Sequence, residues 1–155
     1  MPLRSVIVDT SALYALVDTG DPHHQEAARY LRQLGRGVSL LVAEPTLLET
    51  MTLIKGRLGS AIALRTLQSI NASNRYRVAR LTEADYAETW RLLEHYSDKS
   101  WSPLDCACLA IARSRQITEA FAFDIHFDQM AAAGLLRVPR RDWLRAPASA
   151  ILAPV

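Results

Sequence analysis

Four acidic residues of this chain lie where their carboxylates could act together on a phosphate ester. They are Asp9, Glu49, Asp105 and Asp124. Sets of ligands made only of oxygen suit Mg²⁺ or Mn²⁺. One or two such ions polarise a phosphodiester, lower the pKa of a bound water and stabilise the leaving oxygen. The residue types therefore indicate metal-dependent hydrolysis, provided that the fold brings the four side chains together.

Three of these acids also have an ordinary structural explanation. Asp9 follows an apolar run and precedes a predicted helix, so a cap or turn role is sufficient for it. Glu49 on its own is a typical solvated residue of a helix face. Asp105 is the third residue after Ser102, the spacing of a capping box, where a carboxylate also favours the helix dipole. For Asp105 the capping and the chemical interpretations stand level.

The hydrophobic pattern predicts strands that alternate with helices. Apolar runs give predicted strands at 6–8, 38–43, 76–81, 117–123 and 135–138. This alternation implies right-handed crossovers and a parallel sheet with both faces covered. The expected fold class is α/β, a three-layer α/β/α sandwich around a central, mostly parallel sheet of about five strands.

In such a sheet, ligands bind beyond the carboxyl ends of the strands. Asp9 and Asp124 each end a predicted strand at this edge. Glu49 lies in the helix after another strand, and Asp105 lies in the first turn of a helix that leads to the next one. Unpaired like charges at one site repel each other, and a hard divalent cation is the usual remedy. The spacing therefore favours a shared Mg²⁺ or Mn²⁺ site over four separate caps.

Histidine and cysteine offer no competing zinc site. His23 and His24 lie among polar neighbours in the first turn of a predicted helix, and we interpret them as surface residues. Cys106 and Cys108 are two positions apart on a predicted helix, so their side chains point in different directions. The sequence thus predicts a site built from oxygen ligands.

Length and composition favour one domain that folds without disulfides. The chain has 155 residues, 50% of them hydrophobic, and a formal charge of +2. We expect a single domain over 1–145 and a flexible tail over 146–155. No run approaches the ~20 apolar residues of a membrane span, and Asp9 interrupts the N-terminal apolar stretch. We expect a cytoplasmic protein without membrane association.

Taken together, the motifs resemble those of the PIN-domain nucleases, and among these the VapC-type toxins of bacterial toxin–antitoxin pairs. The matching residues are Val8-Asp9-Thr10-Ser11-Ala12-Leu13, Glu49, Ser102-Pro103-Leu104-Asp105 and Phe123-Asp124-Ile125-His126-Phe127. The resemblance runs from about Ser5 to Val138, in the family's order and spacing. Each motif alone is weak, and their combination is fairly specific.

The resemblance implies an endoribonuclease in which the four acids form the metal-binding and catalytic set. It also implies that Asp128 is an accessory metal ligand and that Ser11 is a polar neighbour of the site. The chain departs from the pattern at Ala122, where many members carry threonine. A hydroxyl is therefore missing near Asp124.

The resemblance further implies two protein partners: a second copy of the chain in a homodimer, and a small antitoxin. The antitoxins of VapC-type toxins place a C-terminal segment in a groove near the active site. Tryptophan is enriched in interface hot spots, and Trp90, Trp101 and Trp143 are available as anchors. For most of them, a place in the core is the better explanation.

Three other functions fit less well. A haloacid-dehalogenase-type phosphatase needs a second aspartate two residues after the first, where this chain has Ser11. A response-regulator receiver needs an acidic pair before the strand that ends in its phospho-accepting aspartate, and no acid precedes Asp9. The main alternative is a non-catalytic PIN-like module that binds RNA or protein. Such a module is free to lose some of the four acids, and this chain keeps all of them.

Overall fold

The computed structural model describes residues 4–139, and a parallel sheet of four strands forms its centre. The strands are β1 (Ser5–Val8), β2 (Ser39–Ala43), β3 (Tyr76–Ala79) and β4 (Ala120–Phe121). They lie in the order β3-β2-β1-β4, and all three pairings are parallel. Ile7 of β1 pairs with Leu41 on one side and with Ala120 on the other. The strand that leads to Asp9 is therefore an inner strand of the sheet.

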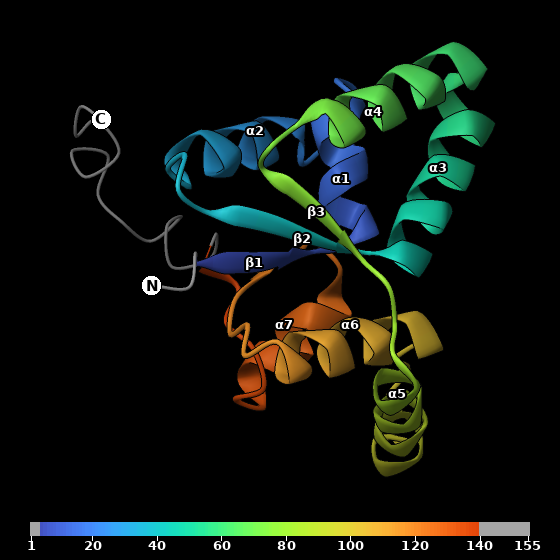
Figure 1. Cartoon of the computed structure of the whole chain (residues 1–155), viewed down its shortest axis with the longest axis vertical. Helices are drawn as coiled ribbons and strands as arrows, with labels where there is room; N and C mark the ends of the chain where they lie inside the picture. Colours follow the sequence, from blue (N-terminus) through green and yellow to red (C-terminus); the bar gives the residue numbers. More distant parts are fainter. Residues whose placement is uncertain (1–3, 140–155) are drawn as a thin grey trace.

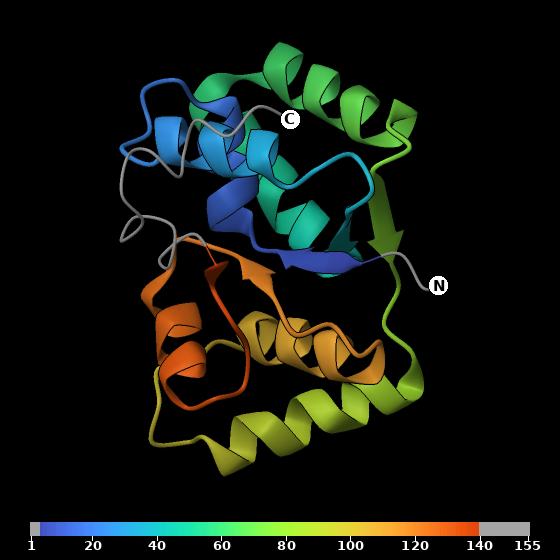
Figure 2. The same cartoon turned by 90° about the vertical axis from the view of Figure 1, so that its left-hand side faces the viewer.

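Helices cover both faces of this sheet. In the described part of the chain they are α1 (Thr10–Val17), α2 (His24–Gln33), α3 (Glu44–Leu58), α4 (Ser60–Ala72), α5 (Glu83–His95), α6 (Pro103–Ser114) and α7 (Ile125–Ala132). Figure 1 shows α1 to α4 on one side of the sheet and α5 to α7 on the other. Figure 2 shows the sheet between the same two layers from a second direction. The predicted three-layer α/β/α architecture is confirmed.

The apolar runs of the strands supply the core on both faces. Val6 and Val8 are fully buried and pack into a cluster with residues of α1 and α2. Ile7, between them, is also fully buried and packs into a second cluster with residues of α6. Successive side chains of a strand point to opposite faces, so a strand covered on both sides must be apolar throughout.

The sheet is smaller than the prediction of about five strands. The run at 135–138 contributes one isolated parallel bridge, between Arg137 and Glu119. Arg137 N donates to Thr118 O at 2.7 Å, and Ala120 N donates to Arg137 O at 2.8 Å. Pro139 follows directly and has no N–H to extend the pairing. β4 likewise covers only part of the run at 117–123.

α3 and α4 are joined at Gly59, whose φ of 93° lies in the region that favours glycine. Within residues 4–139, no helix combines the length and apolarity that crossing a membrane requires. The predicted tail at 146–155 and Trp143 lie outside the described residues, and the domain boundary at 145 stays a prediction.

Candidate active site

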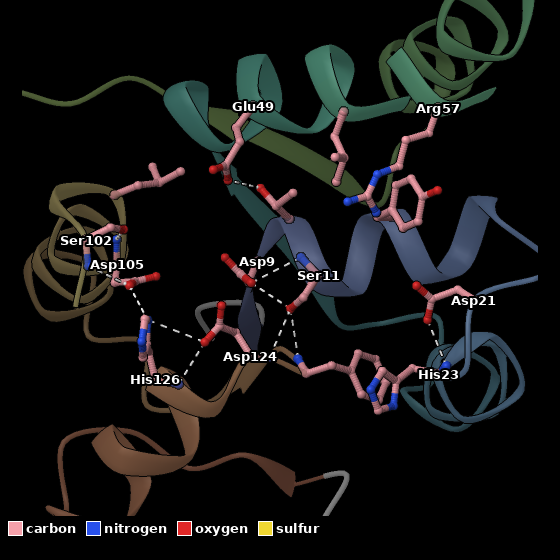
Figure 3. Close-up of a pocket in the computed structure, with 15 residues that line it drawn as sticks. Asp9, Ser11, Asp21, His23, Glu49, Arg57, Ser102, Asp105, Asp124 and His126 are labelled. Carbon is pink, nitrogen blue, oxygen red and sulfur yellow. Dashed lines mark hydrogen bonds and ion pairs between the residues drawn. The ribbon is translucent and has the colours of Figure 1, made fainter. Parts of the chain in front are cut away.

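All four predicted acids line one cavity at the carboxyl edge of the sheet. The cavity has a volume of about 540 Å³, and Figure 3 shows the acids around one end of it. Asp9 is the N-cap of α1 directly after β1, and Asp124 is the N-cap of α7. Glu49 comes from α3, and Asp105 from the first turn of α6. The structure thus brings the four side chains to one cavity, as expected of residues at the carboxyl edge of a parallel sheet.

Asp9 is the buried acid of the group. Its side-chain oxygen Oδ2 accepts hydrogen bonds from Ser11 N at 3.1 Å and from Ser11 Oγ at 2.6 Å. Burial raises the pKa of the Asp9 carboxyl to about 6, against the lowering effect of the Ser11 bonds. The charges of Asp105 and Asp124 make a smaller contribution to this shift, in the same direction as burial. A cation beside Asp9 would favour its charged form, because opposite charges lower the pKa of a carboxyl.

Glu49 is exposed on α3 and is oriented by a chain of hydroxyl groups. Thr10 Oγ1 donates to Glu49 Oε2 at 2.6 Å. Thr50 Oγ1 donates to Thr10 Oγ1 at 3.2 Å and to Thr46 O at 2.7 Å. Thr10, Thr46 and Thr50 are buried between α1 and α3, so the glutamate at the surface is held by polar groups beneath it.

Asp105 caps α6 and also lines the cavity, so the capping interpretation is confirmed and the chemical interpretation stays a prediction. Ser102 and Asp105 form a complete capping box: Asp105 N donates to Ser102 Oγ, and Ser102 N donates to Asp105 Oδ2 at 2.8 Å. His126 Nδ1 lies 2.7 Å from the same Oδ2 and 3.4 Å from Asp124 Oδ1. His126 therefore links α6 to α7 across the cavity, and the capping box fixes where Asp105 stands in it.

Ser11 connects Asp9 to the end of β4, as expected of a polar neighbour of the site. Its Oγ accepts from Phe123 N at 2.9 Å and from Asp124 N at 3.3 Å. Ala122, the position at which the chain departs from the expected pattern, is fully buried. The hydroxyl of Ser11 thus holds the backbone of Asp124 in a chain that has alanine at this position.

Each of the four carboxylates keeps one oxygen without a hydrogen bond to the described residues. These atoms are Asp9 Oδ1, Glu49 Oε1, Asp105 Oδ1 and Asp124 Oδ2. The donor chemistry fits Mg²⁺ or Mn²⁺, since every donor is a carboxylate oxygen. In residues 4–139, however, no three His, Cys, Asp or Glu side chains are arranged to hold an ion as they stand. Binding an ion therefore requires these side chains to turn toward each other.

Comparison with known proteins gives the family. A model of the PIN domain matches residues 6–133, which is most of the chain. The chain belongs to the PIN-domain family. Its curated relatives include the 23S rRNA-specific endonuclease VapC20 of Mycobacterium tuberculosis, which is 30% identical over 133 residues, or 86% of this chain and 97% of VapC20.

Solved structures of PIN-domain proteins agree with this assignment. The crystal structure of Mycobacterium tuberculosis VapC20, described as a sarcin–ricin-loop-cleaving toxin, is 29% identical with a TM-score of 0.75. The match covers 86% of this chain and 98% of VapC20. VapBC2 from Rickettsia felis, solved with a promoter DNA fragment, matches 81% of this chain and 92% of its own at 12% identity and a TM-score of 0.62. That second likeness concerns the fold alone.

Three further residues bear on the predicted site. Asp128 lies on α7 and is not among the described residues that line the cavity, so its accessory role stays a prediction. His23, interpreted as a surface residue, is exposed but lines the cavity and stacks on Phe123. Arg57 also lines the cavity and was missed. Its spacing held a signal, because Glu49, Leu53 and Arg57 recur every four residues on one side of α3.

Proposed function

We propose that this PIN-domain protein is an endoribonuclease that hydrolyses RNA phosphodiester bonds with Mg²⁺ or Mn²⁺. The observation that carries the proposal is the set of four carboxylates around one cavity, each with one oxygen free of hydrogen bonds. The similarity to VapC20, an rRNA endonuclease, supports RNA as the substrate class. Asp9, Glu49, Asp105 and Asp124 would hold the metal. When bound, the metal ion would polarise the phosphodiester and lower the pKa of a water molecule.

The other side chains of the site hold the acids in place. Ser11 and Thr10 each bind one oxygen of an acid, Asp9 and Glu49 respectively, which leaves the other oxygen to face the cavity. His126 does the same between Asp105 and Asp124. Each of these bonds limits the orientations that its acid can take while the carboxylates turn toward a shared ion. We therefore assign positioning roles to these three residues.

Purified protein should cleave RNA only when Mg²⁺ or Mn²⁺ is present. Asp9→Asn and Asp105→Asn should each reduce cleavage by at least about 100-fold, because each removes a ligand charge. The measurement is gel analysis of single-stranded and structured RNA, with and without EDTA. Glu94→Gln, an exposed acid on α5, is the matched control and should leave cleavage unchanged. RNA that binds without being cut under any of these conditions would favour the non-catalytic alternative.

We further propose that the protein is the toxin of a toxin–antitoxin pair and forms a homodimer. The similarity to VapC20, whose solved structure is described as that of a toxin, supports the first part. Trp101 is not available as an anchor, since it is buried and donates from Nε1 to Gln129, whereas Trp90 is 54% exposed.

Induced expression should arrest bacterial growth, and Asp9→Asn should be harmless. Co-expression of a short neighbouring reading frame should restore growth; a wild-type protein without effect on growth would contradict the toxin assignment.

A further inference from the structure

The cavity has a second end that the four acids do not occupy. Figure 3 shows Arg57 and His23 at that end, away from Glu49, Asp105 and Asp124. Among residues 4–139, Arg57 is the one lysine or arginine that lines the cavity. RNA brings one negative charge with each phosphate, so a strand that reaches the acids needs a cation beside it. Arg57 is in the position to supply that charge.

The Arg57 guanidinium lies over the aromatic ring of Tyr14. Its Cζ lies 5.2 Å from the centroid of the Tyr14 ring, within the range of a cation–π contact. The Tyr14 hydroxyl donates to Asp18 Oδ2 at 2.7 Å, which fixes the ring and occupies the nearby acid. Arg57 is exposed, hydrogen-bonds to the Tyr14 side chain, and its charge is felt by Asp18. A planar guanidinium carries five N–H donors, more than the Tyr14 contact uses, and its fork matches the geometry of a phosphate.

His23 offers a flat surface in the same cavity as this cation. Its ring stacks on Phe123, with centroids 4.5 Å apart and planes at 20°. Phe123 is buried, whereas the His23 side chain is 48% exposed. Unpaired bases of single-stranded RNA stack on exposed aromatic and histidine rings. His23 therefore has the properties of a platform for one base.

Hydrogen bonds through Ser11 connect the stack of His23 and Phe123 to Asp9. Phe123 N donates to Ser11 Oγ at 2.9 Å, and Ser11 Oγ donates to Asp9 Oδ2 at 2.6 Å. Asp21 lies at the same end, where its Oδ1 accepts from His23 N at 2.8 Å. Its negative charge disfavours a phosphate on that side, so the phosphate is directed to Arg57. A strand bound at this end is thus placed at a fixed distance from the acids.

We propose that the Arg57 and His23 end of the cavity positions single-stranded RNA for cleavage. Arg57 binds a phosphate neighbouring the one that is cut, and the base of the adjoining nucleotide stacks on His23. This inference rests on the proposed ribonuclease function. It adds that substrate affinity depends on two residues outside the set of four acids.

The charge of Arg57 is tested by RNA binding in the inactive Asp9→Asn background. The probe is a short, fluorescently labelled single-stranded RNA, and fluorescence anisotropy gives its Kd at several salt concentrations. Arg57→Gln should weaken binding about tenfold or more. It should also reduce the slope of log K against log salt by about 0.7. Lys55→Gln removes the same charge from an exposed position of α3 that does not line the cavity, and should have little effect. Arg57→Lys should restore the salt slope but only part of the affinity.

The stack is tested at His23 with the same probe and with cleavage kinetics in the active protein. His23→Ala should weaken binding and raise KM by about 5-fold or more, because base stacking contributes about 1–3 kcal/mol. His23→Phe keeps a flat ring and should restore both values. His95→Ala is the control, since His95 is the last residue of α5, contacts Tyr96 and does not line the cavity.

The outcomes separate this inference from the proposed function. If wild-type protein cleaves RNA and both Arg57→Gln and His23→Ala keep the wild-type Kd, KM and salt slope, the subsite is wrong and the ribonuclease assignment stands. If no RNA is cleaved with either metal but the variants weaken binding as expected, the subsite stands and the catalytic function fails. An equal loss of affinity in Lys55→Gln and Arg57→Gln would show general surface attraction and overturn the assignment of Arg57.

Discussion

At the scale of single residues, Asp9 combines burial with a position among other acids. Its carboxyl is 6% exposed, and burial raises its pKa to about 6. The two bonds from Ser11 offset this only in part. In the absence of a cation, ionising Asp9 therefore works against folding. The residue best placed for chemistry is also one that destabilises the metal-free chain at neutral pH.

This predicts a pH-dependent gain in stability for Asp9→Asn in metal-free buffer. The folded state holds the Asp9 proton more tightly than the unfolded chain, so this group's contribution to stability falls as pH rises from about 4 to about 6 and stays constant above. The substitution should raise the free energy of unfolding by roughly 1–3 kcal/mol near pH 7.5 and change it little near pH 4. Denaturation in EDTA at both pH values measures this; a loss of stability at pH 7.5 would contradict it.

Residues at the site differ in how far the sequence could predict them. Asp9, Asp105 and Asp124 were found because each adjoins an apolar run or a helix start, which are local signals. Glu49 lies inside its helix, and its signal was its nearness to the end of the preceding strand. Arg57 carried a weaker signal, its four-residue spacing from Leu53 and Glu49. His23 carried none, because its stack on Phe123 joins the turn before α2 to the end of β4, about 100 residues apart in the chain. Contacts of that kind depend on how loops cross the sheet edge.

At the scale of elements, α6 shows how one residue can cap a helix and line the cavity at the same time. The capping box directs one oxygen of Asp105 to Ser102 N and leaves the other for the cavity. α5 begins with the same device, in which Thr82 and Asp85 form a capping box away from the cavity. The two helices therefore allow the capping and chemical roles of Asp105 to be separated.

Ser102→Ala and Thr82→Ala should each lower the free energy of unfolding by about 1 kcal/mol, since each removes an N-cap side chain. Thr82→Ala should leave cleavage by the folded protein unchanged. Ser102→Ala should reduce cleavage far less than Asp105→Asn does, because Ser102 N and His126 still orient the carboxylate. Chemical denaturation and cleavage rates measure the two effects. If Asp105→Asn loses stability like Ser102→Ala but keeps its cleavage rate, capping alone explains Asp105.

At the scale of the whole molecule, the alternation of strands and helices predicted the layers and the edge at which the site lies. It overestimated the sheet, because the pairing of 135–138 ends after one bridge next to Pro139. The pairing ends there because Pro139 lacks the backbone N–H that would continue it, a feature that the hydrophobic pattern does not report. The acids nevertheless come from both sides of the sheet, with α1 and α3 in one layer and α6 and α7 in the other (Figure 1).

A metal ion shared by acids from both layers should stabilise the entire fold. An ion that binds only the folded state adds RT ln(1 + [L]/Kd), about 2.7 kcal/mol at a hundredfold excess over Kd. For a chain of this size that raises Tm by roughly 5–10 °C. Thermal melts with and without Mn²⁺ measure the shift, which Glu94→Gln should keep and Asp9→Asn should largely lose. A wild-type Tm that does not respond to millimolar Mn²⁺ would contradict the metal site, because the four acids would then meet at the cavity without binding an ion.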